Sequence, residues 1–125
     1  MARVEDNREE YEKRLNNALK VAFKSIGLTM QANAVIEINK AVYDTPESPS
    51  YVRTGNLRSS LEARSAIQTD ERSATVGTNV EYAPYVEYGT SRGMPPRPFL
   101  RPAIENHMTE YENILAIELG EVGEP

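Results

Sequence analysis

The chain has 125 residues, the usual size of one domain with its own core, so we treat residues 1–125 as a single domain. Its 19 acidic residues against 14 basic ones give a formal charge of -5, which argues against a protein whose main task is to grip nucleic-acid phosphates. The chain contains no cysteine, which excludes disulfides and thiolate metal sites. Its first residues lack the apolar run of a signal peptide or a membrane span, so we expect a protein made in a cytoplasm with no membrane partner.

The N-terminal third of the chain predicts two helices. A capping-box variant starts at Asp6, and apolar residues then recur at spacings of three and four until Gly27, which is expected to end the first helix. Thr29 is expected to cap a second helix, whose apolar period continues to Val42. The proline-containing residues 44–50 should form a loop, because proline interrupts a helix.

The middle of the chain predicts a short helix and a hairpin. Leu57 and Leu61 sit one helical turn apart after a tight corner, which fits a short helix. Residues 63–69 and 73–79 are rich in alanine, threonine, valine and isoleucine, and they alternate loosely in the manner of strands. Because the residues between these two segments are charged, we expect an antiparallel hairpin there.

Residues 82–90, with the sequence YAPYVEYGT, combine three tyrosines with a proline and a glycine. Pro84 suits the first turn of a helix and Gly89 suits its end, so a helix of about one and a half turns fits between them. Residues 91–98 contain three prolines, which lack backbone donors, and should therefore form an exposed extended arm or loop.

The last regular element should be a helix that Pro102 opens and that ends before Gly120. Its expected apolar stripe is Ile104, Met108, Tyr111, Leu115 and Leu119. Residues at about 1–5 and about 120–125 should be flexible tails. The elements predict an α+β domain with N-terminal helices, a small antiparallel sheet with a short helix and a proline-rich arm, and a C-terminal helix packed on the sheet. The expected turn positions are Thr54, Gly55, Pro84, Gly89, Pro98 and Pro102.

Side chains that could carry catalysis are scarce. His107 is the only histidine and, without cysteine, cannot join a histidine-based metal cluster, so we interpret it as a residue on the flank of the last helix. Ser60 has no neighbouring histidine and no glycine elbow, which leaves acyl transfer without support. Glu81 and Glu87 could pair as acid and base, but solvated carboxylates are far commoner. We therefore expect no catalytic, cofactor or metal site, although a small enzyme with a deep polar pocket stays open as a rival class.

Three arginines near the tyrosines leave two kinds of binding open. Arg92, Arg97 and Arg101 could pair with phosphates while tyrosine rings stack on bases, as in a nucleic-acid-binding module. Arginine and tyrosine are also enriched at protein interfaces, where arginine forks onto carboxylates. Because the whole chain is acidic, we favour contact with protein and keep nucleic-acid binding as the alternative.

Four short blocks along the chain resemble one known family. They are Thr54, Gly55, Leu57 and Ser60; Val76, Gly77 and Thr78; Tyr82, Ala83, Tyr85, Val86, Glu87, Gly89 and Thr90; and Pro98, Phe99, Leu100, Pro102 and Ala103. In this order and spacing they are similar to the small neck or tail-component proteins of long-tailed bacteriophages and prophages, the Hong Kong-type tail-component family of the head-tail joining apparatus. The first two helices and the C-terminus match that family only in general character.

The resemblance implies a non-enzymatic virion protein at the neck or the head-proximal tail end, assembled in the host cytoplasm. By analogy it forms a ring of six copies between the portal-side connector and the tail tube. Its implied partners are other copies of itself, the adjacent head-closure or connector proteins, and the tail-terminator or tail-tube proteins. DNA would pass through such a ring without specific binding, because an acidic lumen lets phosphates slide.

The tyrosine block is expected to couple subunits. Some of the three tyrosines should pack inward under the sheet, while at least one, together with Glu87, faces the next subunit. The arginines would pair with a neighbour's carboxylate, and Phe99 and Leu100 would anchor the arm. The alternative is that all three tyrosines close the hydrophobic core. The expected contact residues are Tyr82, Tyr85, Glu87, Tyr88, Arg92, Arg97, Phe99, Leu100 and Arg101.

Overall fold

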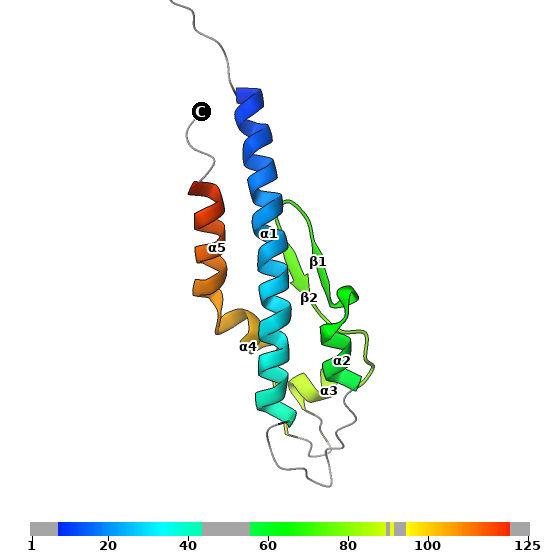
Figure 1. Cartoon of the computed structure of the whole chain (residues 1–125). Helices are drawn as coiled ribbons and strands as arrows, with labels where there is room; N and C mark the ends of the chain where they lie inside the picture. Colours follow the sequence, from blue (N-terminus) through cyan, green and yellow to red (C-terminus); the bar gives the residue numbers. More distant parts are fainter. Residues whose placement is uncertain (1–7, 44–55, 90, 92–94, 121–125) are drawn as a thin grey trace, which may run out of the picture.

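The computed structural model describes residues 8–43, 56–89, 91 and 95–120. A long helix, α1, has the hairpin on one side and the two C-terminal helices on the other (Figure 1). In chain order the elements are α1 (Arg8–Ile38), a π-helical turn (Asn39–Tyr43), α2 (Asn56–Glu62), a 3-10 turn (Arg64–Ala66), β1 (Ile67–Thr69), β2 (Ala74–Val76), α3 (Ala83–Tyr88), α4 (Leu100–Glu105) and α5 (Met108–Gly120). Among the helices in these ranges, none combines the length and the apolar composition that crossing a bilayer requires.

The predicted α+β class is confirmed. The sheet is a two-stranded antiparallel hairpin, and the C-terminal helix packs with it into one core. Helix α1 is the element that both of them contact, since its length lets it present different sides to the hairpin and to α5 (Figure 1). A helix of this kind needs apolar residues on more than one side, and the N-terminal part of the sequence contains them.

The N-terminal region forms one helix, so the predicted break at Gly27 is wrong. Gly27 is buried inside α1, where a Cβ would lie 2.6 Å from Cγ2 of Thr69. The glycine therefore lets the hairpin approach the helix closely. Thr29 caps nothing, because its hydroxyl donates a hydrogen bond to the carbonyl of Ser25 one turn earlier (2.9 Å). A glycine inside a helix costs about 1 kcal/mol relative to alanine. Burial of a continuous apolar face outweighs that cost in α1.

The predicted hairpin is confirmed, and its turn is polar as expected. The register places Ile67 opposite Val76. The N–H of Asp70 donates to the carbonyl of Ser73 (3.0 Å), and the Asp70 carboxylate accepts from the N–H of Arg72 (2.7 Å). The hydrogen bond from the Arg72 N–H first, and one from the Ser73 side chain second, hold the pKa of the Asp70 carboxyl below its usual value. Local turn chemistry thus fixes where the two strands pair.

The C-terminal region forms two helices where one was predicted. Helix α4 begins at Leu100, ahead of Pro102, and a turn at residues 106–107 separates it from α5. The turn breaks the expected apolar stripe, so Ile104 and Met108 are exposed and do not join the core. A single straight helix would keep these residues and the following ones on one face, which the turn prevents.

Tyr111 connects the three helices around this turn. Its ring is buried, its hydroxyl accepts a hydrogen bond from Nδ2 of Asn33 in α1 (3.0 Å), and the same hydroxyl donates to the carbonyl of Ala103 in α4. Burial raises the pKa of Tyr111. The turn at 106–107 is therefore compensated by a buried polar contact that a straight helix would not make.

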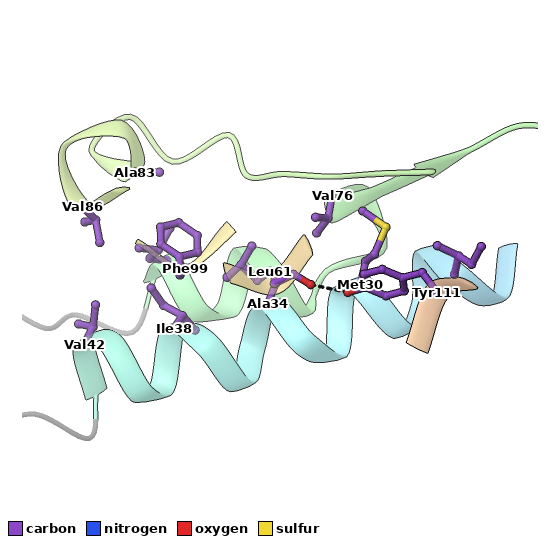
Figure 2. Close-up of a cluster of buried hydrophobic side chains, with 13 residues drawn as sticks. Met30, Ala34, Ile38, Val42, Leu61, Val76, Ala83, Val86, Phe99 and Tyr111 are labelled. Atoms are coloured by element: carbon purple, nitrogen blue, oxygen red, sulfur yellow. Dashed lines mark hydrogen bonds between the residues drawn. The ribbon is translucent and has the colours of Figure 1, made fainter. Parts of the chain in front are cut away.

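The core is one contiguous cluster (Figure 2). At one end Phe99 lies with Val86 and Ile38, and at the other end Tyr111 lies beside Met30. The cluster consists of Ile26, Met30, Ala34, Ile38, Val42, Leu57, Leu61, Val76, Ala83, Val86, Phe99, Ala103 and Tyr111. Both leucines of the short helix predicted after the corner are part of it, which confirms that helix as α2.

Some predicted features lie outside the described residues. They are the loop at 44–50, the corner at Thr54 and Gly55, Arg92, and the tails at 1–5 and 121–125. Pro98 and the residues just before it, from 95 onward, have no regular secondary structure, and most of them are exposed, as expected for the arm.

Candidate interaction surface on helix α3

Helix α3 and its N-cap residue, Tyr82, turn three tyrosines away from the core. The buried residues of this helix are Ala83, Val86 and Glu87. The exposed fractions are 38% for Tyr82, 56% for Tyr85 and 77% for Tyr88. The expectation that some tyrosines pack inward, and the alternative that all three close the core, are therefore both wrong for this chain. Residues spaced by three lie on one side of a helix, and burial of the alanine and the valine turns that side outward. We call these three residues the tyrosine face.

The ends of α3 are fixed as the sequence predicted. Pro84 occupies the first turn, and the helix ends at Gly89, which has a φ of 76° and whose N–H donates to the carbonyl of Tyr85 (2.8 Å). A residue with a side chain adopts such a φ at a cost, which explains the glycine. The N–H of Arg97 in the arm donates to the carbonyl of Val86 (2.7 Å), so the arm is fastened to the same helix.

The carboxylate of Glu87 caps the start of α4. Its Oε2 accepts hydrogen bonds from the backbone N–H groups of Phe99 (2.7 Å) and Leu100 (3.2 Å), and its Oε1 accepts one from the N–H of Arg101 (2.9 Å). The side chain is buried, and an anion at a helix N-terminus is stabilised by the N–H groups that point at it. Phe99 is completely buried beneath this cap, so it anchors the arm in the core of its own chain.

The sequence gives little sign of this cap. Phe99, the residue that precedes α4, offers no side-chain hydrogen bond to the helix, so its first N–H groups need an acceptor from elsewhere. That acceptor is 12 to 14 residues earlier in the chain. The sequence predicted that Glu87 faces a neighbouring subunit. No local signal indicates the cap, because only the fold brings α3 and α4 together.

The four sequence blocks contact each other in pairs. Oγ of Ser60, from the first block, lies 2.5 Å from Oγ1 of Thr78 in the second. The same threonine oxygen accepts from the N–H of Val80 (3.2 Å), which begins the approach to α3. Glu87 joins the third block to the fourth. Hydrogen bonds thus join the first block to the second and the third block to the fourth.

A groove of about 400 Å³ lies between α3 and α4, beside the tyrosine face. We call it the α3–α4 groove. Its walls are formed by Pro84 and Tyr88 on one side and by Leu100, Arg101 and Ile104 on the other. Apolar atoms of these side chains therefore dominate the opening. A partner with a narrow apolar ridge would fill it.

The two described arginines of the block are engaged within the chain. Nη1 of Arg97 donates to the carbonyl of Ala41 (3.4 Å), in the middle of the π-helical turn. Nε of Arg101 donates to Oε1 of Glu105 one turn later in α4 (3.0 Å). The contact of Arg101 is on the surface, where such pairs exchange readily with other partners.

His107 has a larger role than the flank position predicted for it. Its Nδ1 lies 2.9 Å from Oε2 of Glu110, and its Nε2 lies 3.2 Å from Oε1 of Glu37 in α1. The side chain of Glu37 is buried, and Lys40 approaches the same oxygen at 3.8 Å. The hydrogen bonds to Glu110 first and to Glu37 second raise the pKa of His107. This histidine thus bridges α5 and α1.

Neither a metal-binding cluster nor a base beside Ser60 is found among the described residues. They contain no group of three histidine or carboxylate side chains that could hold a metal ion. A hollow of about 300 Å³ beside Ser60 has small and amide side chains on its walls, among them Gln68, Thr75 and Asn79, and no ionisable group among the residues that line it. A serine nucleophile there would have no base.

A family model described as "Bacteriophage HK97-gp10, putative tail-component" matches residues 2–89. The match takes in α1, α2, the hairpin and α3, and therefore the first three sequence blocks up to Gly89; the block from Pro98 to Ala103 lies beyond it. Neither a search of curated proteins nor a search of solved structures found a match. The range covers well over half of the chain and confirms the resemblance that the motifs indicated. The chain therefore belongs to the HK97 gp10-like family of bacteriophage tail components.

Proposed function

We propose that this chain is a structural protein of the phage neck that assembles as a ring, of six copies by analogy, joins the head connector to the tail and lines the DNA passage. Membership of a tail-component family implies a structural role in the virion without catalysis. The observation that carries the assembly proposal is the tyrosine face, which sets three exposed aromatic side chains on one short helix and its N-cap residue.

The tyrosine face has the properties of a protein contact. Tyrosine is enriched at interfaces because its ring buries a large area while its hydroxyl tolerates water. Helix α3 is held by Gly89 at its end and by the Glu87 cap, so docking costs little backbone entropy. The proposed contact residues are Tyr82, Tyr85, Tyr88, Arg92, Arg97, Leu100 and Arg101, with Glu87 and Phe99 as their support.

Two features favour protein contact over the nucleic-acid-binding alternative. Arg97 and Arg101 already bind a carbonyl and a carboxylate, and the chain carries a formal charge of -5. An acidic ring would let the phosphates of passing DNA slide. A mobility-shift experiment with DNA distinguishes protein contact from nucleic-acid binding, because tight and strongly salt-dependent binding of the DNA would support the nucleic-acid module.

The proposed location sets the proposed partners. Assembly takes place in the host cytoplasm, and the finished ring contacts the head-closure or connector proteins on one side and the tail-terminator or tail-tube proteins on the other. The two rims of a ring differ, so one protein can serve both neighbours.

Deletion of the gene from its phage or prophage tests this function. We expect electron microscopy of the lysate to show filled heads and separate tails. A plasmid copy of the wild-type gene should restore joined particles, and a copy with Tyr85→Ala and Tyr88→Ala should not. Ile117→Ala, which alters an exposed residue of α5, is the matched control and should restore them. Joined particles without the gene would contradict the proposed function.

A further inference from the structure

Helix α1 carries an exposed apolar stripe. Val21, Leu28 and Ile36 are exposed to 52%, 54% and 45%, and Ala32 between them is also exposed. Their successive spacings of seven, four and four residues lie close to whole numbers of turns, so they form one line along the helix. We call these four residues the α1 stripe. The hairpin and α5 cover other sides of the helix (Figure 1).

Helix α5 carries a second apolar line. Met108, Leu115 and Leu119 follow one another at spacings of seven and four residues, so they lie on the same side of the helix. Met108 is 45% exposed, and the two leucines are half-buried. We call these three residues the α5 strip. Ile117 follows Met108 by nine residues, or about two and a half turns, and therefore lies on the opposite side of α5.

Each apolar line has one charged residue beside it, and the two charges are opposite. On α1, Lys24 lies about one turn after Val21. On α5, Glu112 lies about one turn after Met108. Both charged residues are exposed, and neither has an ion-pair or side-chain hydrogen-bond partner among the described residues. Contact between two stripes would bring lysines together and contact between two strips would bring glutamates together, so charge favours contact of a stripe with a strip.

The spacings on the two helices match when the helices run antiparallel. On α1, Val21 lies three residues before Lys24, and Leu28 lies four residues after it. On α5, Leu115 lies three residues after the glutamate, and the methionine of the strip lies four residues before it. Because the rise per residue is the same on both helices, placing the glutamate opposite the lysine brings Leu115 to Val21 and the methionine to Leu28.

We propose that the α5 strip of one copy packs antiparallel on the α1 stripe of a second copy, with Glu112 opposite Lys24. The proposal rests on the ring assembly of the proposed function and assigns two surfaces to its contact. The apolar residues exclude water from the contact, and the ion pair fixes its register.

The two surfaces lie on different helices, so the contact is heterologous. Each copy offers one stripe and one strip, and copies add until the rotation closes a ring. If two copies joined both surfaces to each other, growth would stop at a dimer. The proposed contact therefore requires that the strip and the stripe of one copy bind two different neighbours.

Charge reversal in the full chain tests the contact. Lys24→Glu would place two carboxylates opposite each other, and Glu112→Lys would place two ammonium groups opposite each other. The double variant restores an ion pair with the charges exchanged. Arg64→Glu, in the 3-10 turn outside both surfaces, is the matched control. All three residues are exposed, so the variants should keep the wild-type circular dichroism and thermal midpoint.

In analytical ultracentrifugation we expect the wild type and Arg64→Glu to form the same oligomer. Each single variant of the ion pair should raise the concentration of half-assembly by at least about tenfold, and the double variant should return it to within about threefold of the wild type. Single variants that assemble as the wild type does, a double variant no better than the single ones, or a control that fails to assemble would each overturn the proposed contact.

Cysteine pairs test the register and the symmetry, because the chain has no cysteine of its own. Val21→Cys together with Leu115→Cys should give disulfide-linked trimers and larger species on a non-reducing gel after mild oxidation. Val21→Cys together with Ile117→Cys should give none, because Ile117 lies on the opposite side of α5 from the strip. The proposal is wrong if the first pair gives no linked species, if it gives linked dimers alone, or if both pairs link equally.

Failure of this contact can be distinguished from failure of the proposed function. A negative result in either test leaves the neck function standing, since particle morphology after gene deletion decides that separately. A wild type that stays monomeric at every soluble concentration would overturn both the contact and the proposed self-assembly.

Discussion

Oε2 of Glu87 lies 2.7 Å from the backbone nitrogen of Phe99, and this hydrogen bond ties the end of α3 to the beginning of α4. The tyrosine face and the α3–α4 groove depend on that tie, because one is carried by α3 and the other lies between the two helices. The ring of Phe99 is buried beneath the cap and anchors the arm in the core. The proposed interaction surface is therefore supported by one buried carboxylate and one buried ring.

Replacement of Glu87 by alanine should destabilise the fold by about 2 kcal/mol, since it removes a charged cap from three backbone N–H groups. Glu87→Gln keeps an acceptor oxygen and should cost less. Urea denaturation followed by circular dichroism measures both. Glu81→Ala, at an exposed carboxylate of the same region, should change stability by less than about 0.5 kcal/mol. Equal effects of the Glu81 and Glu87 variants would argue against the cap.

Gly27→Ala should destabilise the protein although alanine favours helices. The new Cβ would lie 2.6 Å from Cγ2 of Thr69, and overpacking costs roughly 1 to 3 kcal/mol, against a gain in helix propensity of about 1 kcal/mol. Adding Thr69→Ser removes that methyl group and should restore stability above that of Gly27→Ala alone. Thermal unfolding of the wild type, both single variants and the double variant gives the coupling. Additive effects would show that the close approach does not matter.

The contrast between Gly27 and Gly89 shows how much of the fold the sequence could predict. Gly89 ends a helix between local signals on both sides, and the structure agrees. Gly27 carries the same local signal, but burial against Thr69 decides its role, and Thr69 is remote in sequence. The hairpin was predictable because its turn is polar and short, whereas the turn at 106–107 depends on what Tyr111 meets in the core.

The candidate site divides in the same way. The block with the three tyrosines could be located from composition and spacing. The side of α3 that faces outward could not be predicted, since the sequence does not show whether its tyrosines, its valine or its carboxylate are buried. The outcome depends on α4, whose unsatisfied N–H groups draw Glu87 inward together with Val86. His107 was undervalued for a similar reason, because its partner Glu37 lies in the first helix.

Phe99→Ala should unfold the domain and not merely prevent assembly. The ring is completely buried, and loss of such a side chain costs roughly 3 to 5 kcal/mol, which is a large part of the stability of a small domain. We expect loss of cooperative thermal unfolding in circular dichroism. Tyr85→Ala is the comparison, since its ring is 56% exposed and its removal should leave the unfolding transition nearly unchanged. A folded, monomeric Phe99→Ala protein would instead place this ring in a subunit contact.

Stability should fall as the pH rises above neutrality because of His107. Its hydrogen bonds to Glu110 and Glu37 raise its pKa in the folded state above the unperturbed 6.5. The protonated imidazole donates to both carboxylates, so its contribution is fully present below pH 6.5 and is lost as the pH passes through the raised folded-state pKa. Lys40 lies 3.8 Å from the same Glu37 oxygen and is present in both proteins compared below, so it does not contribute to the difference between them. His107→Gln retains hydrogen bonding but cannot take up the proton. Urea denaturation of both proteins from pH 6 to pH 9 should therefore give a stability difference that shrinks as the pH rises. A difference that is constant with pH would mean that His107 is neutral in the folded protein and that its contacts are ordinary hydrogen bonds.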